Sequence, residues 1–205
     1  MTETYLDQVY RITDDDAKRD LYEKWSGSYD ADLAKEGYAT PSRLAEALAR
    51  VTDDRTLPIL DFGCGTGLAG EMLAQQGFEV IDGCDPAEEM LARARQKGLY
   101  RDLWTIEEGA PLDVAPGAYG TVVACGVIST GAAPPETFDL VTGLLRPGQF
   151  LAFSYNSHST DDPAYMGKLD DILSGGFEQR FAQDGPHLPG IGLTSVVYVL
   201  EKTAP

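Results

Sequence analysis

The stretch Leu57–Gly70 constrains the fold of this chain most, because a short apolar run there ends in an aspartate and then breaks into glycines, LPILDFGCGTGLAG. The run up to Phe62 is apolar without strict alternation, which is typical of a strand covered on both faces of a parallel sheet. The glycines that follow permit backbone angles closed to other residues. From Leu68 the spacing is helical. The stretch therefore predicts a strand, a loop and a helix start, where free backbone N–H groups collect.

The spacing of these glycines limits which ligand the loop can hold. A dinucleotide-binding G-x-G-x-x-G that starts at Gly63 would need glycine at the position of Leu68. No lysine followed by Ser or Thr stands where a phosphate-binding P-loop requires it. A glycine-rich turn that reverses the chain without any ligand stays an alternative for the loop taken alone.

Strand and helix patterns alternate along the rest of the chain. Further strands are expected at 78–85, 99–108, 119–126, 149–155, 177–181 and 194–201, with helices between them and two more helices from Asp14 and Pro41. This order predicts an α/β fold with a doubly wound, seven-stranded, mostly parallel sheet and an antiparallel last strand. We expect one domain over residues 1–205, in which 1–56 form a helical N-terminal extension that covers the α/β core of 57–205.

Composition excludes several classes of partner. With 33 acidic against 16 basic residues, the net charge of −17 repels nucleic-acid backbones and anionic membrane surfaces. No apolar run approaches membrane-spanning length, and the start MTETYLDQVY lacks the regions of a signal peptide, so a cytoplasmic location is expected. The cysteines Cys64, Cys84 and Cys125 are odd in number and widely spaced, which predicts reduced structural thiols and no metal site.

Several motifs, in the correct order, resemble those of the class I S-adenosylmethionine-dependent methyltransferases. Asp61–Gly67 (DFGCGTG) resembles the first motif, Asp85–Leu91 (DPAEEML) the second, and Leu144–Ser154 (LLRPGQFLAFS) a later segment. The pattern is most similar to the Williams-Beuren-region methyltransferase-like small-molecule group. The resemblance implies a Rossmann-like methyltransferase fold, S-adenosyl-L-methionine as cofactor and a small-molecule methyl acceptor. One departure is Gly120, where many relatives have an aspartate.

The resemblance also implies a set of cofactor-binding residues. Asp85 ends its strand and is predicted to accept hydrogen bonds from the ribose hydroxyls, although it can also cap the helix begun by Pro86. Glu107 falls where the family places an acidic side chain near the adenine amino group, with Asp102 and Glu108 as alternatives. The predicted set is Tyr29, Asp61, Gly63, Cys64, Gly65, Gly67, Asp85, Pro86, Met90, Glu107, Glu108, Cys125 and Gly126.

Aromatic residues before the glycine loop resemble the segment that covers the cofactor in many small-molecule methyltransferases. Trp25 lies on a stripe with helical spacing, and packing and ligand contact are equally open for it. Tyr29 is the better ligand candidate, because its short polar neighbours Ser28 and Asp30 indicate the end of a helix rather than its buried middle. Aromatic faces favour a sulfonium by about 0.5–2 kcal/mol.

No catalytic residue is assigned, because methyl transfer mainly requires donor and acceptor to be aligned at about 3 Å. His158, His187 and Tyr155 are candidates, the histidines as proton acceptors, with His187 in the expected loop of the last hairpin. Asn156 is a substrate-contact candidate. The signature of exocyclic-amino methylation, Asn or Asp followed by Pro-Pro and an aromatic residue, is absent after the fourth strand.

Two other functions stay open at this stage. One is a protein that binds S-adenosylmethionine or S-adenosylhomocysteine without transferring methyl, and the other is a nicotinamide-dependent oxidoreductase. The acceptor, beyond its being a small molecule, and the oligomeric state are not predicted.

Overall fold

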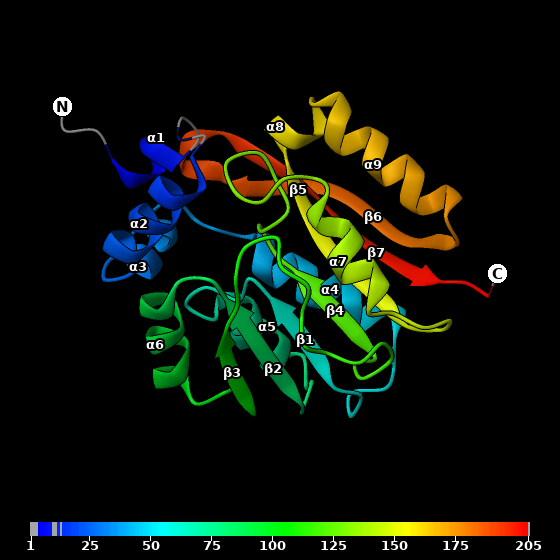
Figure 1. Cartoon of the computed structure of the whole chain (residues 1–205). Coiled ribbons are helices and arrows are strands. Elements are labelled where there is room, and N and C mark those ends of the chain that lie inside the picture. Colours follow the sequence, from blue (N-terminus) through cyan, green and yellow to red (C-terminus); the bar gives the residue numbers. More distant parts are fainter. Residues whose placement is uncertain (1–3, 10–11, 13, 205) are drawn as a thin grey trace.

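A central sheet organises the computed structural model, which describes residues 4–9, 12 and 14–204 (Figure 1). Its strands run in the order β3-β2-β1-β4-β5-β7-β6. They are β1 (Ile59–Phe62), β2 (Ile81–Asp85), β3 (Asp102–Thr105), β4 (Thr121–Ala124), β5 (Phe150–Asn156), β6 (Phe177–Leu188) and β7 (Leu193–Lys202). Strands β1 to β5 pair in parallel, and β7 is antiparallel to both of its neighbours. The expected seven-stranded sheet with an antiparallel last strand is confirmed.

Helices cover both faces of this sheet. Helices α4 (Thr40–Val51) and α5 (Leu68–Gln75) pack on one face, and α7 (Thr137–Gly143) and α9 (Pro163–Ser174) pack on the other. Helix α6 (Glu88–Lys97) lies against β2 and β3. In β1, Ile59 faces the α4–α5 layer, while Leu60 and Phe62 face the α7–α9 layer. The apolar run is therefore continuous because both faces of the strand are buried.

Three N-terminal helices, α1 (Tyr5–Val9), α2 (Asp15–Trp25) and α3 (Tyr29–Lys35), lie together beside α6 (Figure 1); we call α2 and α3 the cover. Helix α2 begins as expected after Asp14, whose carboxylate accepts from the N–H of Ala17. Trp25 is 2% exposed and packs against Leu33 and Leu188. Its indole N–H donates to Asp32 Oδ2 at 2.8 Å. Trp25 therefore packs within the cover, and it also lines a small second cavity.

Tyr29 lies at a helix end, as its polar neighbours predict, and that end is the N-terminus of α3. Its polar neighbour Ser28 precedes the helix, and the Ser28 hydroxyl bonds forward to Asp32 Oδ2 at 2.8 Å. The polar neighbours thus indicate a helix end, but they do not specify whether it is the N-terminus or the C-terminus of the helix.

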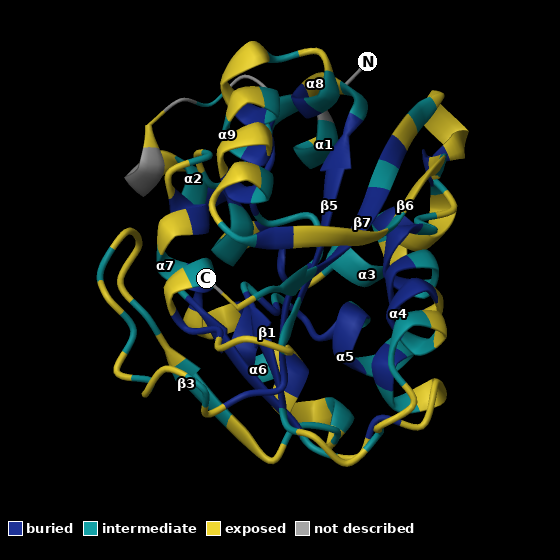
Figure 2. Ribbon diagram, turned by 90° about the vertical axis from the view of Figure 1, so that its right-hand side faces the viewer, coloured by how far each residue is buried: buried dark blue, intermediate teal, exposed yellow. Residues whose placement is uncertain are grey.

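The last hairpin also differs from expectation. Strand β6 does not stop at Phe181 but pairs with β7 as far as Leu188, with register shifts along the way, and the 3-10 turn Pro189–Ile191 joins the two strands. Pro186 fits because β6 is an edge strand with a bulge beside it. Figure 2 shows how exposed this edge is. His187 therefore lies in a strand, and its predicted place in a hairpin loop is wrong.

The ring of Tyr100 fills a slot that glycines leave between α5 and the sheet. A Cβ added to Gly70 would lie 2.3 Å from the Tyr100 hydroxyl oxygen, and one added to Gly83 would lie 2.9 Å from its ring. The Tyr100 hydroxyl donates to Asp61 Oδ2 at 2.7 Å. These glycines bring α5 close to the sheet, so the loop before the helix is held against the strand ends.

We expect Gly70→Ala to lower the free energy of unfolding by about 1–3 kcal/mol, because the new methyl group overpacks against Tyr100. The matched control is Gly167→Ala in the middle of α9, where an added Cβ meets no atom within 4 Å. This control should raise the free energy of unfolding by about 0.5–1 kcal/mol through helix propensity. Urea denaturation measures the free energy of unfolding of both variants. Changes of the same sign in the two variants would contradict the expected clash between the new methyl group and Tyr100.

Candidate functional site

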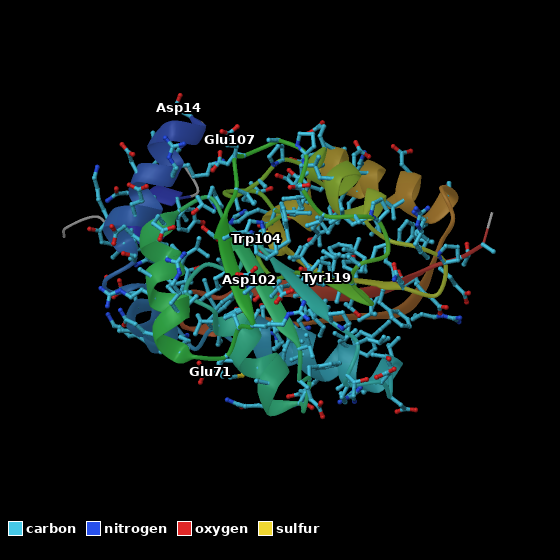
Figure 3. The ribbon with its side chains drawn as sticks, turned by 60° about the horizontal axis from the view of Figure 1, so that its bottom comes forward. Asp14, Glu71, Asp102, Trp104, Glu107 and Tyr119 are labelled. Carbon is cyan, nitrogen blue, oxygen red and sulfur yellow. The ribbon has the colours of Figure 1, made fainter. Side chains whose placement is uncertain are left out.

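A cavity of about 260 Å³ opens beyond the carboxyl ends of β1, β2, β3 and β4, which is the edge where open parallel sheets bind ligands. Tyr22, Tyr29 and Tyr38 from the N-terminal region line its other side. Most of the predicted cofactor residues line this cavity, namely Tyr29, Gly63, Cys64, Gly65, Asp85, Pro86, Met90, Glu107, Glu108, Cys125 and Gly126. In Figure 3, Glu107 lies beyond the end of β3, on the side where α2 begins at Asp14.

The glycines of the loop after β1 have different tasks. Gly63, with φ +66°, packs so tightly that an added Cβ would lie 2.6 Å from the Val127 side chain. Gly65, with φ +54°, faces empty space, because an added Cβ would meet nothing within 4 Å. Gly67 precedes α5 with φ +87° and lies against Tyr100 outside the cavity lining. Gly65 is therefore the point at which a ligand can approach the bare main chain.

Asp85 joins the glycine loop to the start of α6. Its Oδ2 accepts from the N–H of Gly65 at 2.8 Å, and its Oδ1 accepts from the N–H of Ala87 at 2.9 Å. The side chain is 8% exposed, and burial raises its pKa to about 6 against the effect of these two donors, with Glu108 adding a smaller upward contribution. Each carboxylate oxygen keeps a second lone pair, so the helix-start role and ribose binding are compatible.

Asp61 lies behind the loop and does not line the cavity. It is 1% exposed, Tyr100 donates to its Oδ2, and among the described residues its Oδ1 has no hydrogen-bond partner. Burial raises its pKa to about 7, the Tyr100 hydrogen bond opposes this, and the nearby charge of Asp85 adds to it. A cofactor role for Asp61 and Gly67 stays a prediction. Because neither residue lines the cavity, each would act on a ligand indirectly, through the loop that lies between them and the cavity.

The raised pKa of Asp61 predicts a pH-dependent stability. The ordinary pKa of an aspartate is 3.8 and that of Asp61 is about 7 in the fold, so the folded state binds the extra proton and this contribution to stability is lost as pH rises towards 7. From pH 5.5 to pH 8, the free energy of unfolding of the wild type should fall by about 2 kcal/mol more than that of Asp61→Asn. Urea denaturation at both pH values measures this, with Asp53→Asn at an exposed site as the control. Equal losses in wild type and Asp61→Asn would contradict this expectation.

The cover is fastened over the cavity by polar contacts. Asp30, the second residue of α3, accepts a hydrogen bond from the Thr66 hydroxyl in the glycine loop. The same carboxylate pairs with Lys97 Nζ of α6 at 3.0 Å. Lys18 Nζ of α2 donates to the carbonyl of Ala132, in the loop after β4, at 2.7 Å. Sequence reasoning missed these contacts, because each joins residues far apart in the chain.

The structure places the three catalytic candidates outside this cavity. Tyr155 is buried, and its hydroxyl donates to the carbonyl of Tyr165 at 3.0 Å. His158 is exposed on the short helix α8 (Ser157–Thr160). His187 is buried and lines a second, smaller cavity together with Asn156. Which residue, if any, takes a proton stays a prediction.

The cysteines near the site are neutral thiols. Burial raises the pKa of Cys125, at the tip of β4, to about 12, and burial likewise raises the pKa of Cys84 to about 12. No disulfide joins the three cysteines.

Across the described ranges, no group of three His, Cys, Asp or Glu side chains is arranged to hold a metal ion. In the same part of the chain, no helix has the length and apolar character needed to cross a bilayer.

The sheet order and the glycine loop at its carboxyl edge define the class I methyltransferase fold. A TehB-like SAM-dependent methyltransferase from Corynebacterium glutamicum has this fold, with a TM-score of 0.62, 17% identity and coverage of 88% of this chain and 98% of that chain. Residues 60–151 match a family described as a methyltransferase domain. Over these residues the chain is similar to that methyltransferase family.

Two relatives show how far the likeness extends. Methyltransferase-like protein 27 of Homo sapiens is 29% identical over 156 residues, 75% of this chain and 63% of that protein. The 18S rRNA (guanine(1575)-N(7))-methyltransferase of Saccharomyces cerevisiae is 28% identical over 144 residues, 62% of this chain and 50% of that protein. This chain thus spans between half and about two thirds of the length of these relatives. The rRNA acceptor belongs to the second relative, so the acceptor of this chain must be argued from its own residues.

Proposed function

We propose that this chain binds S-adenosyl-L-methionine in the 260 Å³ cavity and transfers its methyl group to a small-molecule acceptor. The observation that supports this most is the pairing of Gly65 with Asp85, at 2.8 Å between the amide nitrogen and Oδ2. It sets a bare stretch of main chain and a strand-end carboxylate side by side on one wall. That combination suits a nucleoside with an amino-acid tail better than a dinucleotide, whose fingerprint the loop lacks.

Each wall of the cavity has a task in this proposal. The loop Gly63–Gly65 would hold the amino-acid portion, Asp85 the ribose hydroxyls, and Glu107 or Glu108 the adenine amino group. Cys125 and Gly126 at the tip of β4 would lie near the sulfur, and Tyr29 would present its ring to the positive charge. All of these residues line one continuous cavity, which supports the assignment.

The cofactor, when bound, supplies a methyl group already activated by positive sulfur. The protein then has to hold the acceptor in line and exclude water. The tyrosines of the N-terminal region close the cavity opposite the sheet edge, and the contacts of Asp30 and Lys18 keep this cover in place. Cys125 stays protonated, so it does not compete with the acceptor as a nucleophile.

A small molecule suits the site better than nucleic acid. The net charge of −17 opposes the approach of a phosphate backbone. The aromatic cover also leaves an enclosed space beside the sheet edge, in which a small acceptor is surrounded on several sides. We further propose that residues 1–205 act as one domain, since the cover supplies a wall of the cavity that the core alone would lack.

The proposal is tested by calorimetric titration of the protein with S-adenosylhomocysteine and with NADH. Binding of S-adenosylhomocysteine alone is expected, and binding of NADH alone would overturn the proposal in favour of an oxidoreductase. The protein is then incubated with methyl-labelled S-adenosylmethionine and a metabolite extract. Label should enter the small-molecule fraction. Tight cofactor binding with no transfer to any fraction would instead identify a protein that binds the cofactor without using it.

Asp85→Ala should weaken binding of S-adenosylhomocysteine at least tenfold, because a charge-assisted hydrogen bond contributes about 1.5–3 kcal/mol. It should also lower the free energy of unfolding by about 1–3 kcal/mol, because the N–H groups of Gly65 and Ala87 lose their acceptor. Glu89→Ala, at an exposed site on α6, is the control and should change neither. Lower stability with unchanged affinity would leave Asp85 with its structural role alone.

A further inference from the structure

A second chamber of about 50 Å³ begins where the first cavity ends. Both are lined by Tyr22, Tyr29, Tyr38, Gly126 and Ala132, so they meet at the tip of β4 under the cover. Cavities that enclose one water occupy about 10–15 Å³, and a dry site for benzene about 150 Å³. The chamber therefore has room for a group of a few heavy atoms, such as one end of a small molecule.

The polar side of this chamber carries an imidazole nitrogen and a hydroxyl that face no protein partner. His187 and Ser129 line it, and they are 7% and 3% exposed. Within the described residues, the only hydrogen bond of the His187 ring is made by Nδ1, and the Ser129 hydroxyl makes none. Neither His187 Nε2 nor Ser129 Oγ is among the enclosed unpaired atoms, so each has some exposed surface, and both residues line the chamber.

A series of hydrogen bonds leads from Arg43 to Nδ1 of the His187 ring. Arg43 Nη1 lies 2.9 Å from Ser195 Oγ, Ser195 Oγ lies 2.8 Å from Thr40 Oγ1, and Thr40 Oγ1 lies 2.8 Å from His187 Nδ1. A guanidinium can only donate, so one lone pair of the Ser195 hydroxyl accepts from it; we infer that this hydroxyl gives its own hydrogen to its other neighbour, Thr40. The Thr40 hydroxyl then donates to Nδ1.

The Arg43 guanidinium, from which this series of hydrogen bonds starts, is itself held in place. Arg43 also donates to the main-chain carbonyls of Gln183 and Pro186 in β6. Burial, followed by the charges of Arg43 and His158, lowers the pKa of His187 to about 4, so the ring is neutral at physiological pH. A neutral ring that accepts at Nδ1 carries its proton on Nε2 and presents a donor to the chamber.

We propose that this chamber binds a neutral carbonyl group of the methyl acceptor, an amide, ester or ketone whose oxygen accepts from His187 Nε2–H and the Ser129 hydroxyl. The proposal rests on the proposed function, because methyl transfer is what makes the bound molecule an acceptor. His187 then binds the acceptor directly through Nε2–H and is not the proton acceptor that sequence reasoning suggested. An ionised carboxylate is disfavoured, because none of the described lining residues carries a charge to replace its hydration.

The proton position is tested without any ligand by nitrogen NMR of the histidine rings. The chain has two histidines, so His158→Gln leaves the signals of His187 alone. We expect Nδ1 to show the unprotonated and Nε2 the protonated type of resonance at pH 7. Ser195→Ala should shift this tautomer balance, while Thr194→Ala, at the exposed neighbouring position, should not. A proton on Nδ1 in the wild type would overturn the proposal.

Ligand chemistry is tested by titrating propionamide and propionate into the protein saturated with S-adenosylhomocysteine, with the His187 resonances as readout. Propionamide should bind at least tenfold more tightly than propionate. Ser129→Ala should weaken propionamide about two- to tenfold, the effect of one neutral hydrogen bond. His187→Phe, followed by the tryptophan resonances, should weaken it at least as much. Equal binding of the two probes, or unchanged affinity in Ser129→Ala, would overturn the proposal.

The two proposals fail in different ways. If S-adenosylhomocysteine does not bind in calorimetry but propionamide still perturbs His187 in the unloaded protein, the methyltransferase function fails and the carbonyl site stands as a binding site. If S-adenosylhomocysteine binds and the propionamide titration leaves His187 unchanged, the carbonyl site fails and the methyltransferase function is unaffected.

Discussion

The contact on which the rest of the site depends is the Asp85 carboxylate between two main-chain N–H groups. It holds Gly65 of one loop and Ala87 of the next in a fixed relation, so two strand ends and two helix starts form a single wall. Burying a carboxylate is costly, and its raised pKa reports that cost. The cost is tolerated because the same burial gives the carboxylate two donors and leaves lone pairs directed at the cavity rim.

Much of the fold was predictable because local signals and tertiary structure agree. The run before Asp61 lacks alternation since helices cover both faces of its strand, and Asp14 and Asp162 cap the helices that they precede, with side chains that accept from nearby N–H groups. The extension of β6 beyond Phe181 was not predictable. Gly185 and Pro186 read as loop residues, yet an edge strand tolerates them, and only the long pairing with β7 shows that they belong to one.

The site was predictable where it follows strand ends and less so where it depends on folding contacts. Gly65 and Asp85 follow from their place in motifs, whereas the link from Asp30 to Thr66 joins segments that no sequence pattern relates. The departure at Gly120 has a steric reason, since a Cβ there would lie 2.7 Å from Leu57 Cβ. Position 120 lies just before β4, at the end of the strand away from the cavity, so the missing aspartate removes nothing from the site.

The tyrosines that line both cavities give them a common wall. Tyr22, Tyr29 and Tyr38 border both spaces, so a substitution of any one of them changes the lining of both at once. Under the proposed function, the cofactor and the acceptor would lie behind this one wall, and an opening of it would expose both bound molecules to solvent.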